Sequence, residues 1–268
     1  MTDSGRGAGP DFIEALARGL DVLRSFRPGT PPVTLSEIAG LTGLARPTVR
    51  RILITLEALG YVRADGRGYA LTPRVLELGM AYVHSLDMWD VARPHMERLV
   101  AQTGESTSMA QLDGSDIVYV ARVAVPKIVT LAVSIGTRFP APATSMGKVL
   151  LAALRPAELD TVLAQPTRSG IDARSQPDRE DLDRTLREVR AKGWALADQE
   201  LALGIRSIAT GVRNGDGQVV AALNVTVHAA ETSVDKLTGH HLPLLLHAAA
   251  DISHDWALRD SAPLVVRA

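Results

Sequence analysis

The stretch that decides the fold of the amino-terminal part of the chain is TLSEIAGLTGLARPTVRRILITLEALGYV, residues 34–62. It opens with a capping box, in which the Thr34 hydroxyl accepts from the amide of Glu37 and the Glu37 carboxylate accepts from the amide of Thr34. A short helix is therefore predicted from here to about residue 41 or 42. Gly43 then supplies the left-handed conformation that a tight turn requires, and a second helix runs on until Gly60 ends it.

These two helices predict a helix-turn-helix. Ala39 is small enough for two helices to cross, and the second helix turns apolar side chains inward at Val49, Ile52, Leu53, Leu56 and Leu59. Its other face offers arginines, hydroxyls and free backbone amides, which suit base edges and phosphates in a DNA major groove. The predicted DNA-binding residues of this helix are Arg46, Pro47, Thr48, Arg50, Arg51 and Thr55.

A β-hairpin is predicted directly after the second helix. Residues 61–63 and 69–71 flank the glycine-rich turn 65–68, and such a wing would bring Arg63 and Arg67 to the DNA backbone or minor groove. The alternative is a packed helical hairpin with solvated arginines. The capping box, the turn glycine, the wing and the charge together favour DNA binding.

Charge is distributed unevenly along the chain. Residues 1–74 hold ten arginines and seven acidic residues, whereas the rest holds 19 basic and 23 acidic residues, so a mildly basic head precedes an acidic body. The segment 44–74 carries six arginines against Glu57 and Asp65, as a phosphate-facing surface requires. A general preference for arginine is the alternative, since the whole chain has only four lysines.

Length and composition bound the remaining possibilities. A chain of 268 residues corresponds to about 1.8 domains of roughly 150 residues, which favours two unequal domains, and 46% hydrophobic residues exclude wholesale disorder. The absence of cysteine excludes disulfides, thiolate metal sites and a cysteine nucleophile. The first ten residues lack the features of a signal peptide, and no apolar run approaches the roughly 18 residues of a membrane span, so we expect a cytoplasmic protein.

Hydrophobic periodicity gives a coarse secondary structure for the other segments. An upstream helix at 12–26 places Phe12, Leu16, Leu20 and Leu23 on one face, and a helix at 73–86 begins at Thr72-Pro73. Further helices are expected at 88–103, 145–154, 156–164, 178–192 and 235–257, and strands near 106–112, 116–123, 128–135, 194–198, 205–213 and 218–228. Hairpins and helices segregated in this way predict an α+β fold with an antiparallel sheet.

Residues 34–62, together with the later segments DGSDIVYVARV, ATSMGKVLLAAL, GWALADQE, GIRSIATGV and VVAALNVTVHA, closely resemble the IclR (isocitrate lyase regulator) family of bacterial transcriptional regulators. The resemblance covers residues 12–258, and the order and spacing of the segments are specific. Within the family, the segments FIEALARGLDVLRSF, TPRVLELG and LDMWDVARP are similar to regulators of protocatechuate, 4-hydroxybenzoate and β-ketoadipate catabolism. The resemblance implies a winged helix-turn-helix domain at 1–72, a linker helix at 73–86, a GAF-like effector-binding domain at 87–258 and a tail at 259–268.

The start of the predicted helix near residue 145 is a candidate carboxylate site. Free amides and the positive end of the helix dipole favour an anion there, and Lys148 adds charge. The resemblance implies that the effector is held at this helix start and by three later segments, at Ser145, Met146, Gly147, Asp198, Ser207, Asn224 and Thr226.

The sequence itself, apart from the resemblance, supports an effector-binding role for some of these residues better than for others. Asn224 and Thr226 lie two apart on a predicted strand and so face the same side, although a polar outer face of a sheet is the alternative. Ser145 and Thr144 have the alternative of an ordinary helix cap. Contact between the Asp198 carboxylate and the carboxylate of the effector is unfavourable unless one of the two is protonated or a water molecule lies between them. Three aromatic residues, Tyr82, Trp89 and Tyr119, are candidates for lining an aromatic-acid pocket, although core packing is the default role of each.

Enzymatic functions fit less well. Residues 143–147 are a variant of the hydrolase nucleophile elbow with Ala in place of the first Gly, but the two prolines in 138–142 remove sheet donors, and the chain lacks βα alternation. A phosphate-binding loop fails because Pro142 and Val149 replace the first glycine and the hydroxyl. We therefore expect no catalysis.

A metal site is also not expected, and neither is a cofactor. The candidate ligands on the last helix, His240, His241 and His247, have no carboxylate at a useful spacing in the sequence.

The sequence thus predicts a DNA-binding transcriptional regulator, modulated by a small aromatic or dicarboxylic acid and controlling aromatic-acid catabolism. The alternative is a ligand-binding sensor or hydrolase-like enzyme without DNA activity. The expected partners are pseudo-palindromic double-stranded DNA, a small organic acid and further copies of the chain as a homodimer or tetramer, with no membrane. The segments 12–26 and 73–86 are expected in the interface between heads.

Overall fold

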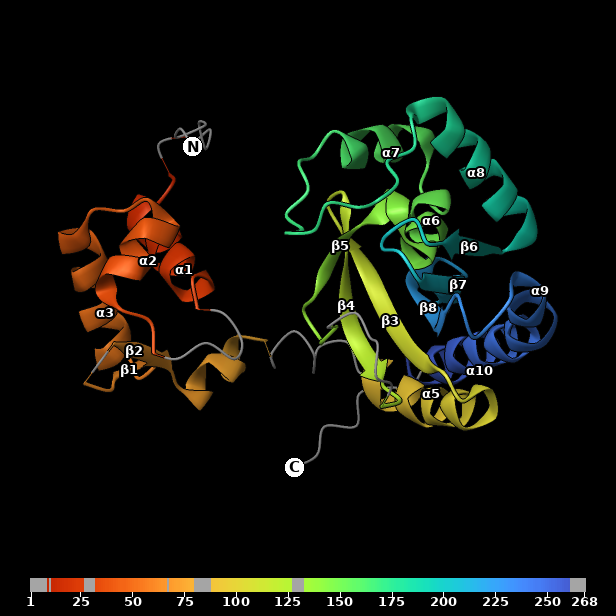
Figure 1. The fold of residues 1–268 in the computed structure, drawn as a ribbon, viewed down its shortest axis with the longest axis horizontal. Coiled ribbons are helices and arrows are strands. Elements are labelled where there is room, and N and C mark those ends of the chain that lie inside the picture. The colour runs from red at the N-terminus through yellow and green to blue at the C-terminus, as the bar shows by residue number, and fades with distance from the viewer. Residues whose placement is uncertain are drawn as a thin grey trace. The chain divides into compact units, whose positions relative to one another are not determined.

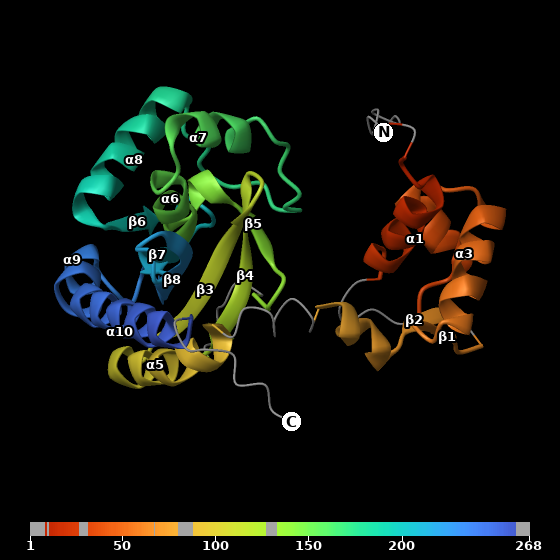
Figure 2. The same ribbon diagram turned by 180° about the vertical axis from the view of Figure 1, so that it is seen from behind.

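The structure is a computed structural model that describes residues 9, 11–26, 32–66, 68–79, 88–126 and 133–260. The chain divides into two compact units, Met1–Ser85 and Leu86–Ala268, which are treated separately below (Figures 1 and 2). Among the described helices, none is long and apolar enough to cross a membrane.

The first unit is a small helical head with a two-stranded hairpin. Its elements are α1 (Glu14–Arg24), α2 (Leu35–Thr42), α3 (Arg46–Ala58), β1 (Val62–Ala64) and β2 (Tyr69–Leu71). The helices enclose a core whose buried members include Ile38, Val49 and Leu53. The helix-turn-helix and its wing are thus confirmed.

Local signals fix the start and end of α2 as the sequence predicts. The amide of Thr34 donates to Glu37 Oε2 at 2.8 Å, and the amide of Glu37 donates to Thr34 Oγ1 at 3.3 Å, so the capping box forms. Gly43 ends α2 with a φ of 70°, in the left-handed region. In the wing, Val33 pairs with Tyr69, and a Cβ at Gly68 would lie 2.7 Å from the Val33 carbonyl oxygen. Only glycine fits at that close approach.

Two expectations for the head need correction. Leu59 is 51% exposed and does not point into the core, because α3 ends at Ala58 and the chain turns there. The segment after the wing begins with a 3-10 turn, Pro73–Val75, and continues as helix over 76–79. The rest of the predicted linker helix, 80–86, lies outside the described residues, as does Arg67.

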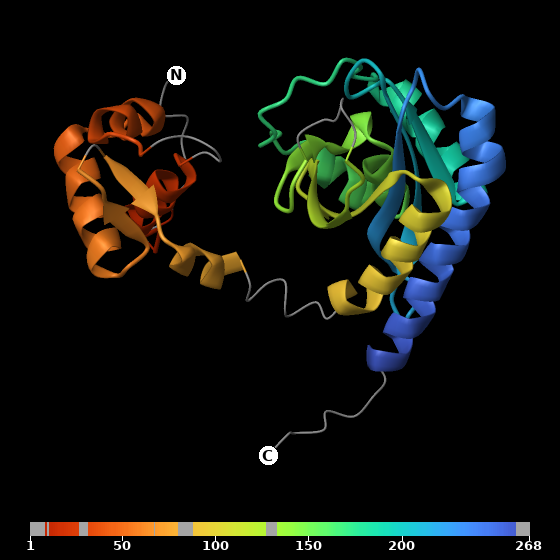
Figure 3. The same cartoon turned by 60° about the horizontal axis from the view of Figure 1, so that its bottom comes forward.

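The second unit is a six-stranded antiparallel sheet covered by helices on both faces (Figures 1 and 3). The strands, in spatial order, are β5 (Arg138–Pro140), β4 (Asp116–Val123), β3 (Ser106–Asp113), β8 (Val219–His228), β7 (Ile205–Arg213) and β6 (Trp194–Asp198). The helices are α5 (Met88–Thr103), α6 (Ser145–Ala152), α7 (Pro156–Leu163), α8 (Arg179–Lys192), α9 (Val234–Lys236) and α10 (Leu242–Asp260). The α+β class is confirmed.

Each face of the sheet has its own core. On one face α5 and α10 bury Met96, Leu99 and Leu223, and on the other α6 to α8 bury Phe139, Leu151 and Leu186 (Figure 3). Both faces of the central strands therefore carry fully buried side chains, such as Met109 and Leu223 on one face and Ala110 and Ala222 on the other.

The structure corrects three element boundaries in this unit. A short strand, β5, forms at 138–140 despite its proline, because it lies at the sheet edge and Pro140 is its last residue. Of the strand expected at 128–135, residues 128–132 lie outside the described part and 133–135 are not strand. The closing helix contains a π-helical turn, Leu237–His241, and α10 extends to Asp260, so residues 259–260 are helical and do not belong to a tail.

Candidate functional site

The first candidate site is the outer face of α3. Arg46, Pro47, Arg50, Arg51 and Thr55 are exposed, and Thr48 is half-buried. The wing adds the exposed side chain of Arg63. None of the four described arginines of this set forms an ion pair with another described residue, so their charges are available to an external anion.

The helix start contributes less than expected. Pro47 has no amide, and the amides of Thr48 and Val49 both donate to Ala45 O, at 2.9 and 3.1 Å. Of the first-turn amides, that of Arg46 is the one without an acceptor in the described residues. Anion binding on α3 therefore rests mainly on side chains.

A second feature of the head is an apolar groove between α1 and α3, with a volume of about 660 Å³. It is lined by Leu16, Leu20 and Leu23 from α1 and by Ile52, Leu56 and Leu59 at α3. Thr48, Arg51 and Thr55 also border it. Arg51 and Thr55 thus lie on the side of α3 that faces α1, whereas Arg46, Pro47 and Arg50 are absent from the groove.

The second candidate site is a pocket in the second unit, between the start of α6 and the sheet. Five of the seven predicted effector-binding residues line it: Ser145, Met146, Ser207, Asn224 and Thr226. Gly147 and Asp198 do not.

The start of α6 presents two amides to this pocket. Thr144 caps the helix, and its Oγ1 accepts from the amide of Gly147 at 2.9 Å, so that amide is already occupied. The amides of Ser145 and Met146 have no acceptor within the described part of the chain. These two donors and the positive end of the helix dipole are what an entering carboxylate would meet.

Gly147 does not line the pocket, but it allows close packing of the backbone beside it. A Cβ at this position would lie 2.0 Å from the carbonyl oxygen of Ala141, in the 3-10 turn that precedes α6 (Ala141–Ala143). Both groups are backbone, so neither can move aside cheaply. Gly147 therefore allows α6 to pack against this turn and fixes where its first amides lie.

The sheet supplies the opposite wall through its register. Ser108 pairs with Asn224, and Ser106 pairs with Thr226, which in turn pairs with Ser207, so all five side chains lie on the face toward α6. Asn224 is buried, and its Nδ2 donates to Thr226 Oγ1 at 3.0 Å while its Oδ1 accepts from the Ser108 amide at 3.0 Å. The alternative of a solvated outer sheet face is thus excluded for Asn224.

Ser145 and Ser207 join the two walls. Their hydroxyl oxygens are 2.8 Å apart, in a hydrogen bond that runs from α6 to β7. Each hydroxyl retains hydrogen-bonding capacity for a ligand.

Asp198 lies on the other side of the sheet. Ala197 pairs with Ser207 and Asp198 with Arg206, so the strand alternation turns Asp198 away from the face that carries Ser207. Arg206 donates to both carboxylate oxygens of Asp198, at 2.8 and 3.1 Å, and this hydrogen bonding lowers the pKa of Asp198. The expectation that Asp198 contacts the effector is corrected by this geometry.

Lys148 does not add charge to the pocket. Its Nζ is buried and donates to Glu200 Oε1 at 2.5 Å and to Leu196 O at 3.2 Å. The resulting ion pair ties α6 to the β6–β7 turn, and Glu200 is one of the pocket-lining residues.

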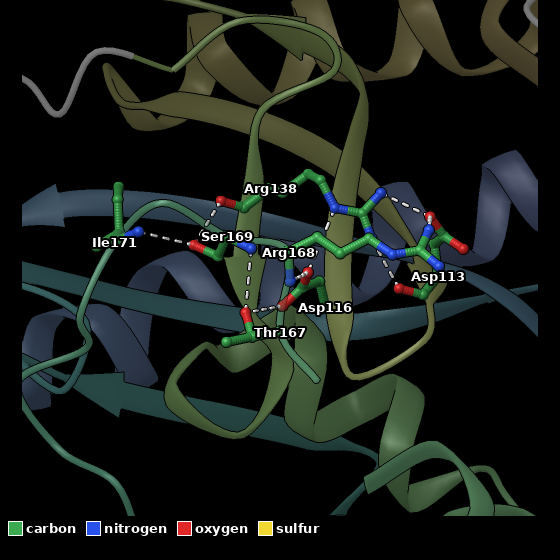
Figure 4. A network of polar contacts seen from close by, with 7 residues as sticks. All are labelled: Asp113, Asp116, Arg138, Thr167, Arg168, Ser169 and Ile171. Atoms are coloured by element: carbon green, nitrogen blue, oxygen red, sulfur yellow. Dashed lines mark hydrogen bonds and ion pairs between the residues drawn. The ribbon is translucent and has the colours of Figure 1, made fainter. Parts of the chain in front are cut away.

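A network of polar contacts holds the connection between α7 and α8 against the sheet (Figure 4). Asp116, which is buried, accepts from Thr167 Oγ1 at 2.6 Å and from the Arg168 amide at 2.7 Å, and Arg138 bridges Asp116 and Asp113. Further along, the Ser175 amide donates to Glu200 O at 2.8 Å. The connection therefore fixes the turn that carries Glu200 at the edge of the pocket.

Of the aromatic residues expected near the effector, one lines the pocket. Tyr119 does so, and its ring meets Phe139 edge to face, with centroids 5.5 Å apart. Trp89 packs into the core on the opposite face of the sheet, and Tyr82 lies outside the described residues. Burial raises the pKa of Tyr119, so its hydroxyl stays protonated at neutral pH.

The sequence interpretation missed several pocket residues, among them Glu105, Arg122, Glu200 and His228. Arg122 lies within the segment DGSDIVYVARV, but a bulge decides where it points. Met109 pairs with Ala121 and Ala110 with Tyr119, so Val120 is an extra residue in β4. Because Tyr119 and Arg122 are three residues apart, a regular strand without the bulge would put them on opposite faces, and no pattern in the sequence reveals the bulge.

The geometry gives no support to a hydrolase elbow. Ser145 follows a 3-10 turn and an antiparallel edge strand, whereas an elbow follows a buried parallel strand. No group of three or more potential metal ligands occurs among the described residues. A carboxylate does lie near one of the three histidines, since His247 Nε2 is 3.5 Å from Asp251, but His247 is largely exposed there.

A winged helix-turn-helix whose described arginines on α3 and the wing form no ion pair with another described residue, together with a separate polar pocket, is typical of a DNA-binding, ligand-responsive regulator. Two family models match the chain: the IclR helix-turn-helix domain over residues 15–66, and the bacterial transcriptional regulator IclR C-terminal domain over residues 80–254. The chain belongs to the IclR family of bacterial transcriptional regulators, which are not enzymes.

Among its relatives, the chain is 42% identical over 246 residues to the Pca regulon regulatory protein of Pseudomonas putida, covering 91% of this chain and 84% of that protein. It is 34% identical over 248 residues to the p-hydroxybenzoate hydroxylase transcriptional activator of Acinetobacter baylyi, covering 90% and 91%. A crystal structure of an IclR homolog from Microbacterium hydrocarbonoxydans complexed with 4-hydroxybenzoate has 27% identity and a TM-score of 0.78, over 92% of this chain and all of that one.

A substitution at Gly147 tests whether its backbone contact positions α6. Gly147→Ala should lower the free energy of unfolding of the second unit by about 1–3 kcal/mol or more, because the added methyl group overlaps the Ala141 carbonyl. Gly170→Ala is the matched control, since a Cβ there meets nothing within 4 Å. Thermal unfolding followed by circular dichroism measures both, and an unchanged midpoint for Gly147→Ala would contradict this role.

Proposed function

We propose that this protein controls genes of aromatic-acid catabolism by binding a pseudo-palindromic promoter site as a dimer or tetramer, and that a small organic acid in its second unit alters promoter occupancy. It would act in the cytoplasm, at the bacterial chromosome. The observation that carries the proposal is the polar row of buried Asn224 and half-buried Thr226 and Ser207, which faces the two amides of α6 that have no acceptor among the described residues. The relatives named above regulate the Pca regulon and p-hydroxybenzoate hydroxylase, which supports the choice of pathway.

The proposed mechanism is a population shift. The effector binds one arrangement of the paired heads better than another, and DNA does the same, so each changes the affinity of the other. A ligand with equal affinity for both arrangements would change nothing.

For DNA, the proposed reading residues are Arg46, Pro47, Thr48, Arg50, Arg51 and Thr55 on α3, with Arg63 and Arg67 on the wing. Arg50 lies on the open side of α3, whereas Arg51 borders the groove shared with α1. Arg50 is therefore the better placed of the two for base edges.

Replacing both Arg50 and Arg51 by Ala should weaken binding to a fragment of the protein's own promoter by about 1–3 kcal/mol per base-reading arginine. Of the single variants, Arg50→Ala should cost more than Arg51→Ala. Arg67→Ala should weaken all sequences more evenly, as loss of a phosphate contact does. Gel-shift titration at fixed salt measures these effects, with Arg187→Ala, an exposed position on α8 in the second unit, as the charge-matched control. A double variant that binds like wild type would remove α3 from the DNA interface.

For assembly, the proposed partner of the groove between α1 and α3 is a second copy of this chain. Its α1 side exposes Leu16 by 61% and Leu20 by 42%, an apolar face that water does not favour. One head of this size covers a single half-site, so a pair of heads is needed for a palindrome.

Analytical ultracentrifugation of the full chain at micromolar concentration should therefore show at least a dimer. Leu16→Glu should weaken binding to a two-half-site fragment, because it places a charge in the interface between heads. Leu203→Glu is the control, since Leu203 is also exposed but lies in the second unit. A strict monomer, or equal effects of the two substitutions, would overturn the proposed head interface.

For the effector, the proposed ligands are acids of four to seven carbons, with protocatechuate, 4-hydroxybenzoate and β-ketoadipate as first candidates. Asn224→Ala and Ser207→Ala should each cost about 1–3 kcal/mol of affinity by leaving a buried group unpaired, and Ser145→Ala should cost less. A bound acid raises the unfolding temperature by linkage, so thermal shift across an acid panel measures this. Absence of any shift at millimolar acid, or shifts unaffected by these substitutions, would place the pocket elsewhere.

A further inference from the structure

The pocket has a positively charged residue at the end remote from α6. Arg122 on β4 lines the pocket, and its Nη1 donates to Ser108 Oγ at 3.0 Å, which draws the guanidinium over β3. Arg122 pairs with Ser108 in the β3–β4 ladder, and Ser108 pairs with Asn224 in the β3–β8 ladder. Arg122 therefore belongs to the same polar row as Asn224, on the same face of the sheet.

The charge of Arg122 is not balanced by a carboxylate. It forms no ion pair within the described part of the chain, although burial disfavours its charged form and lowers its pKa. Two carboxylates line the pocket, from Glu105 and Glu200, and neither is an ion-pair partner of Arg122. Glu200 is bound to Lys148 instead. A half-buried guanidinium without a counter-ion favours an anion in the space beside it.

The two ends of the pocket are close enough together for one short molecule to reach both. Ser207 lies on β7 and the Arg122 guanidinium reaches over β3, two strands away in the order β3-β8-β7. Strands in a sheet are roughly 4.8 Å apart, so the two ends are separated by on the order of 10 Å. The chain of a four- to seven-carbon acid bridges such a gap with a hydrogen bond at each end.

We propose that Arg122 is a specificity-determining residue that binds a second carboxylate of the effector, so that the pocket prefers a dicarboxylate to a monocarboxylate of equal length. This inference rests on the proposed function, because the first carboxylate is the one that the start of α6 captures. The β4 bulge at Val120 is what places Arg122 and Tyr119 in the same pocket, with the Tyr119 ring as an apolar wall beside the guanidinium.

Isothermal titration calorimetry on the full chain tests the proposal with adipate and hexanoate, which match in length and differ in the second carboxylate. Wild type should bind adipate about tenfold more tightly or better, as a charge-assisted hydrogen bond provides. Arg122→Gln should bring the ratio of the two affinities close to one, because it weakens adipate binding more than hexanoate binding, and Arg122→Lys should keep part of the preference. Arg213→Gln, an exposed position on β7 with the same change of charge, should keep the wild-type ratio.

The outcomes separate this inference from the proposed function. Asn224→Ala should weaken both acids alike, because it acts on the shared carboxylate. If hexanoate and 4-hydroxybenzoate bind and depend on Asn224, but adipate gains nothing or its gain survives Arg122→Gln, the pocket stands and the role of Arg122 is wrong. If no acid binds to a folded protein, the effector pocket itself fails, and the inference fails with it. Unfolding midpoints of the Arg122 variants equal to that of wild type show that a lost preference is not a loss of fold.

Discussion

Burial of both faces of the six-stranded sheet is the constraint on which the rest of the second unit depends. With α5 and α10 on one face and α6 to α8 on the other, a polar side chain on a central strand loses water and needs a partner. Toward α10 the strands meet this demand with apolar residues such as Leu223 and Val225. Toward α6 they keep Ser108, Asn224 and Thr226, where apolar side chains would give a simpler core. Departures of this kind from the best-packed sequence are expected where a ligand binds.

The head obeys a different constraint. Its core is small, with six buried apolar side chains, and its charged face carries arginines that no described carboxylate neutralises. Contacts to phosphates give such a unit affinity but little discrimination between sequences, and in the proposed dimer a second head would supply that discrimination. An effector would then need to change only how the two heads are arranged, and coupling free energies of about 1–3 kcal/mol suffice for a several-fold change in occupancy.

How much of this was predictable depends on the range of the interactions involved. The capping box at Thr34, the turn at Gly43 and the helix periods are local, and the structure follows them closely. The strand edge that tolerates Pro140, the pairing of Lys148 with Glu200 and the outward side of Asp198 depend on segments far apart in the sequence. Asp198 shows this most clearly. Its neighbour Ala197 points toward the pocket, and the register of β6 alone determines which of the two residues faces that side of the sheet.

The same dependence on register would separate the two halves of the proposed effector site. The proposed carboxylate end is formed by α6, β7 and β8, and the Gly147 contact and the Ser145 to Ser207 hydrogen bond fix how α6 lies against them. The far end of the pocket belongs to β4, where a single extra residue, Val120, sets which side chains face inward. A regular strand that kept Val120 would turn Arg122 to the other face of the sheet, whereas the bulge holds Arg122 opposite Ser108 and Tyr119 opposite Ala110. Tyr119 and Arg122 lie within DGSDIVYVARV, a segment that also carries the family resemblance, so the sequence pattern alone does not show that both face the pocket, and their side of the sheet has to be read from strand pairing.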